Sequence, residues 1–139
     1  MRSFLTVVVG FLLALSVLPL AHSEVGSRVA LVIGNGAYQS VPKLRSPVDD
    51  AQAIDRALTA LGFRVIRLEN ATKEQMEGAI LELSRQLRPG ATSLVYYSGY
   101  GINVDGRNYL LPVNAEITTP ESLAIQAIGV QEAGVLQAA

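Results

Sequence analysis

Apolar and polar positions follow two different periods along this chain, and each period predicts a different kind of element. "RVALVIG", residues 28–34, is an unbroken apolar run closed by glycine, which is typical of a central strand covered on both faces. "FRVIRLEN", residues 63–70, predicts a second strand, and "TSLVYYS", residues 92–98, predicts a third, buried strand. Apolar positions at helical spacing occupy both intervals between these strands.

Two helices are therefore predicted. In the first, Ser46 is the expected N-cap, Pro47 a first-turn residue and Gly62 the stop signal. Its apolar stripe comprises Ala51, Ile54, Leu58 and Leu61. In the second, Thr72 and Gln75 form a capping box. Its stripe comprises Met76, Ile80, Leu83 and Leu87. Strands alternating with helices predict an α/β fold with a parallel sheet and helices packed against its faces.

The last third of the chain predicts a hairpin and then weaker structure. Asp105-Gly106 separates "INV" from "RNYLL", and Asp-Gly is a strong signal for a two-residue hairpin turn. After Pro112 we expect a loop, followed by the beginning of a helix around Gln131 to Ala138. No further strand follows to cover the third one, so we expect an apolar sheet edge that favours self-association.

Residues 1–23 have the pattern of a signal peptide. Arg2 precedes a long apolar run, and the small residues of Ala21-His22-Ser23 fit a signal peptidase site, with cleavage after Ser23. This interpretation predicts a periplasmic or secreted protein with no stable membrane anchor. The alternative is an uncleaved anchor, because the apolar run is nearly long enough to span a bilayer.

Composition then removes several classes of function. The chain has 139 residues, enough for one domain, here residues 28–139, and a formal net charge of −1. That balance, without a basic cluster in the sequence, argues against a nucleic-acid partner. There is no cysteine, and the one histidine, His22, lies in the predicted signal peptide. We therefore expect no disulfide, no metal and no cofactor.

A glycine motif follows the first strand, where a dinucleotide fingerprint would begin. Gly34-Asn35-Gly36 lacks the third glycine of that fingerprint, because position 39 is Gln39. Glycines that let the backbone turn sharply are the simpler explanation.

Other polar residues also have structural explanations. Ser98 lacks both the G-x-S-x-G setting and a histidine base, so we expect a strand-end hydroxyl bonded to backbone. Asp49 and Asp50 suit the positive end of the first helix. Asp55 suits a solvated helix face beside Arg56, rather than a metal site.

Several motifs carry a family resemblance. They are "IGNGAY" at the end of the first strand, "DDA" in the first helix, "ALGF" before the second strand, and "YYSGYG" followed by "DGRNYLLP". Together they resemble the caspase-like cysteine peptidases, in their bacterial metacaspase-like (orthocaspase) branch, from about Arg28 to Leu136. The resemblance implies a caspase/hemoglobinase-like three-layer α/β sandwich with a mainly parallel sheet, incomplete at its C-terminal side. It also implies a family that cleaves peptide bonds with a Cys-His dyad.

Two departures from the family pattern bear on activity. The family's corner is Ser-Gly-His-Gly, with histidine as general base and acid, and this chain has Tyr100 at that position. A phenol, whose ordinary pKa is about 10, stays protonated at neutral pH and does not activate a thiol as imidazole does. The family's nucleophilic cysteine follows a further strand that this sequence does not include. Neither member of the dyad is then intact.

The resemblance assigns roles to two other positions. Gly101 matches the glycine whose backbone N–H contributes to the family's oxyanion hole. Arg45 lies near the place where animal caspases bind an acidic substrate side chain. The implied branch usually prefers basic residues at the cleavage point, so a plain loop charge is the alternative for Arg45.

These observations predict an exported, non-catalytic pseudo-peptidase that binds a protein or peptide partner. Two alternatives stay open. The first is a fragment of a cysteine-type endopeptidase that takes part in proteolysis. The second, which rests on Gly34-Asn35-Gly36 alone, is a nucleotide-binding α/β module.

Overall fold

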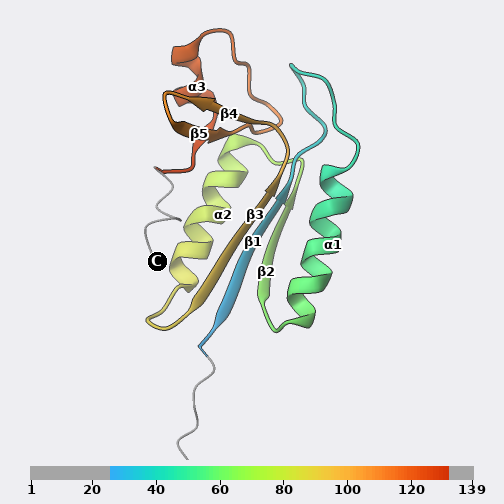
Figure 1. Ribbon diagram of the computed structural model, residues 1–139, viewed down its shortest axis with the longest axis vertical. Helices are drawn as coiled ribbons and strands as arrows, with labels where there is room; N and C mark the ends of the chain where they lie inside the picture. Colours follow the sequence, from blue (N-terminus) through green and yellow to red (C-terminus); the bar gives the residue numbers. More distant parts are fainter. Residues whose placement is uncertain (1–25, 132–139) are drawn as a thin grey trace, which may run out of the picture.

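The computed structural model describes residues 26–131 and has three layers (Figure 1). The central sheet is parallel, with strand order β2-β1-β3. Its strands are β1 (Arg28–Gly34), β2 (Arg64–Glu69) and β3 (Thr92–Ser98). The helices on its two faces are α1 (Pro47–Ala60) and α2 (Lys73–Gln86). This arrangement confirms the expected α/β sandwich around a parallel sheet.

β1 is buried on both faces because its side chains alternate between two hydrophobic cores. Val29, Leu31 and Ile33 pack in the core that includes α2. Ala30 and Val32 pack in the core that includes α1. All five side chains are at most 3% exposed, so the unbroken apolar run does mark the central strand.

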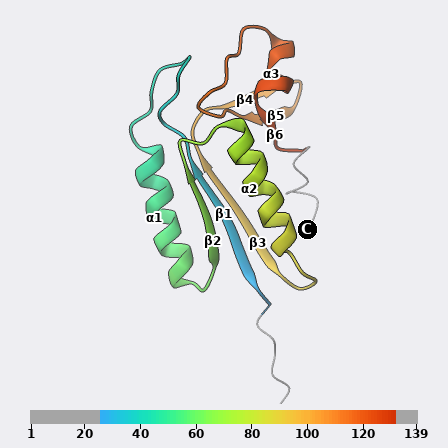
Figure 2. The same ribbon diagram turned by 180° about the vertical axis from the view of Figure 1, so that it is seen from behind.

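A second, antiparallel sheet stands at the carboxyl ends of the parallel strands (Figures 1 and 2). Its strands, in the order β4-β5-β6, are β4 (Gly101–Val104), β5 (Arg107–Leu110) and β6 (Ile128–Gly129). Asp105 and Gly106 both have positive φ, as a type I′ turn requires, which confirms the predicted hairpin. The helix α3 (Pro120–Gln126) shares a separate small core with this sheet.

The sequence pattern did not reveal α3 or β6. α3 has a capping box at Thr119, but its N3 residue is Ser122 rather than Glu or Gln, and β6 has two residues. Both signals are too short for periodicity to detect. Beyond Gln131, the helix predicted to reach Ala138 lies outside the described residues, as does the signal peptide 1–23. No helix within residues 26–131 is long and apolar enough to cross a membrane.

The two long helices begin differently, although both starts were predicted at the right residues. The Thr72 side chain accepts the Gln75 N–H at 3.4 Å, and the Gln75 side chain accepts the Thr72 N–H at 2.9 Å, which confirms the capping box. Ser46 is the N-cap of α1 but makes no side-chain capping bond, because its own backbone is helical (φ −89°, ψ −21°). Leu61 is 61% exposed and lies past the last helical residue, so its place in the apolar stripe was wrong.

β3 is less buried than its apolar sequence suggested. It pairs with β1 and with no other strand among the residues described, so one of its edges is open. Its side chains range from partly buried to exposed, and Val95 is 38% exposed. The prediction of a buried strand was therefore wrong, whereas the edge position agrees with expectation.

Candidate functional site

The corner after β3 is shaped around two tyrosine hydroxyls. β3 ends at Ser98, and Gly99 and Tyr100 then lead into β4. A Cβ atom at Gly99 would collide with the hydroxyl oxygens of Tyr38 and Tyr97. Only glycine lets the backbone approach both hydroxyls this closely.

The backbone of Tyr100 is held from both sides. Its N–H donates to Tyr38 Oη at 2.8 Å. Its carbonyl accepts the Tyr97 O–H at 2.9 Å and the Leu111 N–H at 3.0 Å. The rings of Tyr100 and Tyr38 are tilted by 60° with centroids 4.9 Å apart, a favourable aromatic geometry. The side chain is thus packed against the small core of the second sheet.

Tyr38 and Tyr97 are hydrogen-bond donors at neutral pH. Their hydroxyl oxygens lie 2.9 Å apart, and each can also donate to the Leu111 carbonyl, at 3.1 and 2.9 Å respectively. Burial raises the pKa of both phenols, because a buried phenolate loses its hydration. They therefore fix the corner in place and do not supply a base.

Two asparagines that the sequence analysis overlooked fasten the ends of the neighbouring strands. Asn35 is fully buried, and its side chain accepts a backbone N–H at 2.8 Å and donates to the Leu111 carbonyl at 3.2 Å. Asn70 accepts the N–H groups of Gly36 and Ala37, both at 2.9 Å. Each asparagine directly follows a strand at the carboxyl edge of a parallel sheet, which was the available signal.

The glycines of Gly34-Asn35-Gly36 serve close packing, not a sharp turn. Neither glycine has a positive φ. A Cβ at Gly34 would collide with the Pro47 carbonyl, and one at Gly36 with the Leu44 carbonyl. The explanation by a turn was therefore wrong.

Gly101 directs its N–H away from the hairpin. Because the Leu111 N–H donates to the Tyr100 carbonyl, Gly101 and Leu110 face each other without mutual hydrogen bonds. Within residues 26–131, β4 has no strand on its other side. The Gly101 N–H thus points to an open edge, where a carbonyl oxygen of a ligand can reach it.

The other candidate residues, Arg45 and Ser98, do not hydrogen-bond to Tyr100 in the part of the chain that the structure describes. Arg45 is exposed and follows Leu44, which packs against the same small core as Tyr100. The Ser98 hydroxyl donates to the carboxylate of Asp50 at 3.3 Å. The expected bond from Ser98 to backbone was therefore wrong, because α1 presents a side-chain acceptor.

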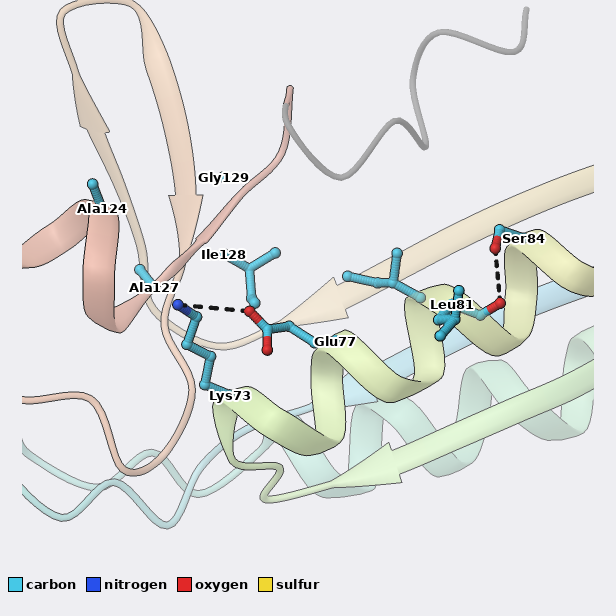
Figure 3. A pocket seen from close by; sticks show the side chains of 9 residues that line it. Lys73, Glu77, Leu81, Ser84, Ala124, Ala127, Ile128 and Gly129 are labelled. Carbon is cyan, nitrogen blue, oxygen red and sulfur yellow. Dashed lines mark hydrogen bonds and ion pairs between the residues drawn. The ribbon is translucent and has the colours of Figure 1, made fainter.

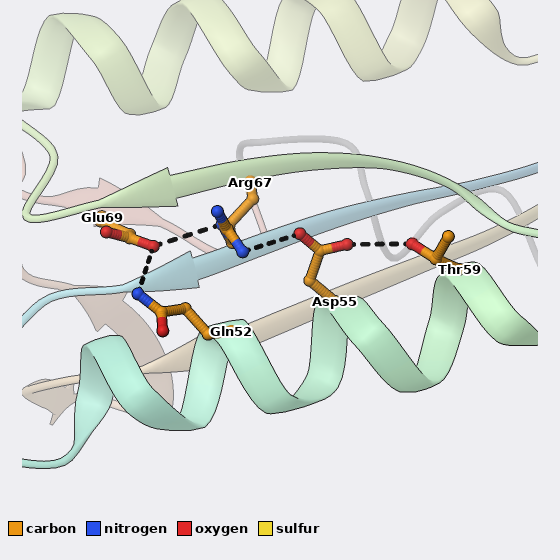
Figure 4. A network of polar contacts seen from close by, with 5 residues as sticks. All are labelled: Gln52, Asp55, Thr59, Arg67 and Glu69. Carbon is orange, nitrogen blue, oxygen red and sulfur yellow. Dashed lines mark hydrogen bonds and ion pairs between the residues drawn. The ribbon is translucent and has the colours of Figure 1, made fainter.

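Asp55 belongs to a polar network between α1 and β2 rather than to a solvated helix face (Figure 4). Its carboxylate lies 3.0 Å from the Arg67 guanidinium and accepts the Thr59 hydroxyl at 3.0 Å. Arg67 is also 3.3 Å from Glu69. These groups are partly exposed, so each pair contributes less than about 1 kcal/mol. In the part of the chain that the structure describes, no three metal-ligating side chains cluster.

A hollow of about 370 Å³ lies away from the corner, between α2 and the segment α3–β6 (Figure 3). Leu81 and Ile128 contribute to its apolar walls. Lys73 and Glu77, 3.6 Å apart, stand at one end. Neither Tyr100 nor the other candidate site residues line it, so the hollow is a separate feature.

The amino-acid sequence is similar to sequences of known proteins. Residues 27–132 match the family model described as the caspase domain. The chain is also similar to mucosa-associated lymphoid tissue lymphoma translocation protein 1 of Homo sapiens and to its homolog in Mus musculus, each 36% identical over 88 residues. Each match covers 63% of this chain and 11% of the relative, so the chain spans about a tenth of these relatives.

Proposed function

This chain belongs to the caspase-domain family, and we propose that it is a non-catalytic member, a pseudo-peptidase that binds a protein or peptide without cleaving it. One observation carries the proposal. Tyr100 stands where the family has its catalytic histidine, and the sequence contains no histidine after His22 and no cysteine. Peptide cleavage by the family's dyad needs a thiol as nucleophile and an imidazole as base. The sequence after His22 contains neither of these groups.

The packing of the Tyr100 ring supports the proposal. The ring lies 4.9 Å from the Tyr38 ring, centroid to centroid, and packs against the small core of the second sheet.

The same corner still offers groups that recognise a peptide. The outward N–H of Gly101 can donate to a peptide carbonyl, as a strand edge does in β-strand addition. The exposed guanidinium of Arg45 can bind a carboxylate near the same end of the sheet. Binding of an extended peptide needs no nucleophile, so it is compatible with Tyr100.

The proposal also names a branch of the family and a cellular location for the protein. The "YYSGYG" corner and the "DGRNYLLP" hairpin support the metacaspase-like (orthocaspase) branch. Arg2, the apolar run and Ala21-His22-Ser23 support export to the periplasm or the medium, with cleavage after Ser23. The alternative is that these residues are part of an active cysteine-type endopeptidase, which family membership favours. The coding sequence downstream of Ala139 decides between them: an in-frame strand that ends in a cysteine would favour the peptidase.

Activity is tested on the exported chain with peptides that carry Arg, Lys or Asp before the scissile bond. We expect no turnover above a buffer blank. Tyr100→His alone should also give none, because a base without a nucleophile starts no covalent chemistry. Parent turnover that a change at Tyr100 abolishes would contradict the proposal. Activity in the Tyr100→His variant would do so too, with Ser98 as the first suspect nucleophile.

Binding is tested separately with a library of immobilised peptides. Gly101→Pro removes the outward N–H, whereas Gly101→Ala keeps it, and the nearest atom to an added Cβ is the Tyr109 carbonyl oxygen at 3.6 Å. We expect peptide binding to be lost in Gly101→Pro and retained in Gly101→Ala, with both variants folded by circular dichroism. Equal binding in all three proteins would show that this edge is not the recognition surface.

A further inference from the structure

Four arginines gather at the end of the molecule opposite Tyr100. They are Arg28, Arg64, Arg85 and Arg88, and they line a hollow of about 250 Å³, called here the arginine hollow. It lies where the parallel strands begin and α2 ends, far from α3 and the hairpin (Figures 1 and 2). The four arginines lie apart in the sequence and form no basic run, so the sequence pattern did not predict this cluster. The fold brings them together.

Strand register explains the convergence. Arg64 is the first residue of β2, next to Val29 of β1 and on the same face as Ile66, which packs in the α2 core. Arg85 and Arg88 lie in and just after the last turn of α2, over that same face. Arg28 has a different role, since its guanidinium donates to the Leu61 carbonyl at 2.8 Å. Three arginines thus share the α2 side of the sheet, and the fourth supports the rim.

The local charge balance is strongly positive. No salt bridge within residues 26–131 involves any of the four arginines. The opposing charges are small: the carboxyl end of α2 carries about half a negative charge, and Glu82 supplies one carboxylate, which accepts from Gln86 Nε2 at 3.1 Å. Arginines without carboxylate partners around a concave surface attract an anion, because their forked donors match its oxygens.

We propose that the arginine hollow binds a small phosphate-bearing ligand. Its volume is below the roughly 300–1,000 Å³ of pockets for drug-sized ligands, so it suits a phosphate or diphosphate group rather than a whole nucleotide. The phosphate belongs either to a soluble molecule or to an anionic lipid headgroup. This site is independent of Tyr100 and of the proposed pseudo-peptidase role.

The test measures pyrophosphate binding to the exported chain by calorimetry at about 0.15 M salt, where distant surface charges are largely screened. Arg64→Gln and Arg85→Gln each remove one charge from the arginine hollow. Arg56→Gln removes one from the exposed face of α1 and is the matched control. We expect each variant in the hollow to weaken binding about tenfold or more, because it loses one charged, forked donor for the phosphate oxygens. The control should bind as the parent does.

Melting curves without ligand show that each variant is folded before binding is compared. A second arm measures co-sedimentation with vesicles of phosphatidylglycerol, against vesicles of phosphatidylcholine alone. Vesicle binding that is lost in Arg64→Gln and Arg85→Gln but kept in Arg56→Gln identifies a headgroup as the source. Pyrophosphate binding without vesicle binding identifies a soluble ligand. If neither binds, or if Arg56→Gln weakens binding as much as the other two variants, the proposal is wrong.

Discussion

Tyr38 and Tyr97 place two buried phenols, with oxygens 2.9 Å apart, beneath the corner that carries Tyr100. Burial raises the pKa of both groups above the ordinary value near 10. The unfolded chain releases these protons first, so stability is fully present below about pH 10 and is lost as pH rises through the folded-state pKa values. We predict alkaline unfolding that becomes shallower in Tyr97→Phe, because one of the two phenols is gone.

Urea unfolding between pH 7 and pH 11 measures this effect. At pH 7, Tyr97→Phe should lose about 1 kcal/mol, since its hydroxyl no longer donates to the Tyr100 carbonyl. Above pH 10 the free energy of unfolding should fall less steeply with pH in the variant than in the parent. Identical slopes would mean that Tyr97 is not a source of the alkaline loss.

At the same scale, sequence reasoning found residues whose role follows from neighbours in the chain and missed those that act across it. The hairpin turn at Asp105-Gly106 needs two positive φ angles, a local demand that the residue types reveal. Asn35 bonds to the carbonyl of Leu111, 76 positions away, and nothing local announces that contact. Tyr97 supports Tyr100 through a hydroxyl whose orientation depends on the fold.

Helix starts give a matched pair of predictions at the scale of elements. Thr72 makes its capping bond in α2, whereas Ser46 stands at the same place in α1 and makes none. Thr72→Ala should therefore cost about 1 kcal/mol of unfolding free energy, and Ser46→Ala close to nothing. Urea denaturation of both variants at pH 7 compares them directly. Equal losses of unfolding free energy would show that the side-chain capping bond of Thr72 does not stabilise the protein.

The order of the long elements was predictable because the apolar positions of each one recur at the spacing of a strand or of a helix. The apolar run of β1 and the stripe of α2 persist over several turns or pleats, so the alternation of strands and helices could be deduced without a structure. α3 and β6 span 7 and 2 residues, and they are stabilised by the small core that they share with the hairpin. Tertiary packing, which the sequence does not display, decides elements of that length.

Across the whole molecule, the two ends of the parallel sheet have different chemistry. The carboxyl ends of the strands hold Tyr100 in a network of neutral hydrogen bonds. The other end gathers arginines that lie far apart in the chain. The family resemblance led to the first end, because motifs are local in sequence. The family resemblance did not predict the arginine hollow, because residues that only folding brings together do not form a motif in the sequence.

The open edge of β3 gives the last prediction. Within the described residues β3 pairs only with β1, and its sequence contains no charged residue to discourage another strand from pairing there. An unpaired apolar edge is a template for a second copy, and a domain of this size has little stability to spare. We expect light scattering on residues 24–139 to show dimers or larger species at micromolar concentration. Val95→Lys should shift them towards monomer, because a lysine on an edge strand opposes pairing. Leu81→Lys is the control, since Leu81 is an exposed apolar residue of α2 rather than of the edge strand. A monodisperse parent monomer with a cooperative, high-temperature melt would contradict this prediction.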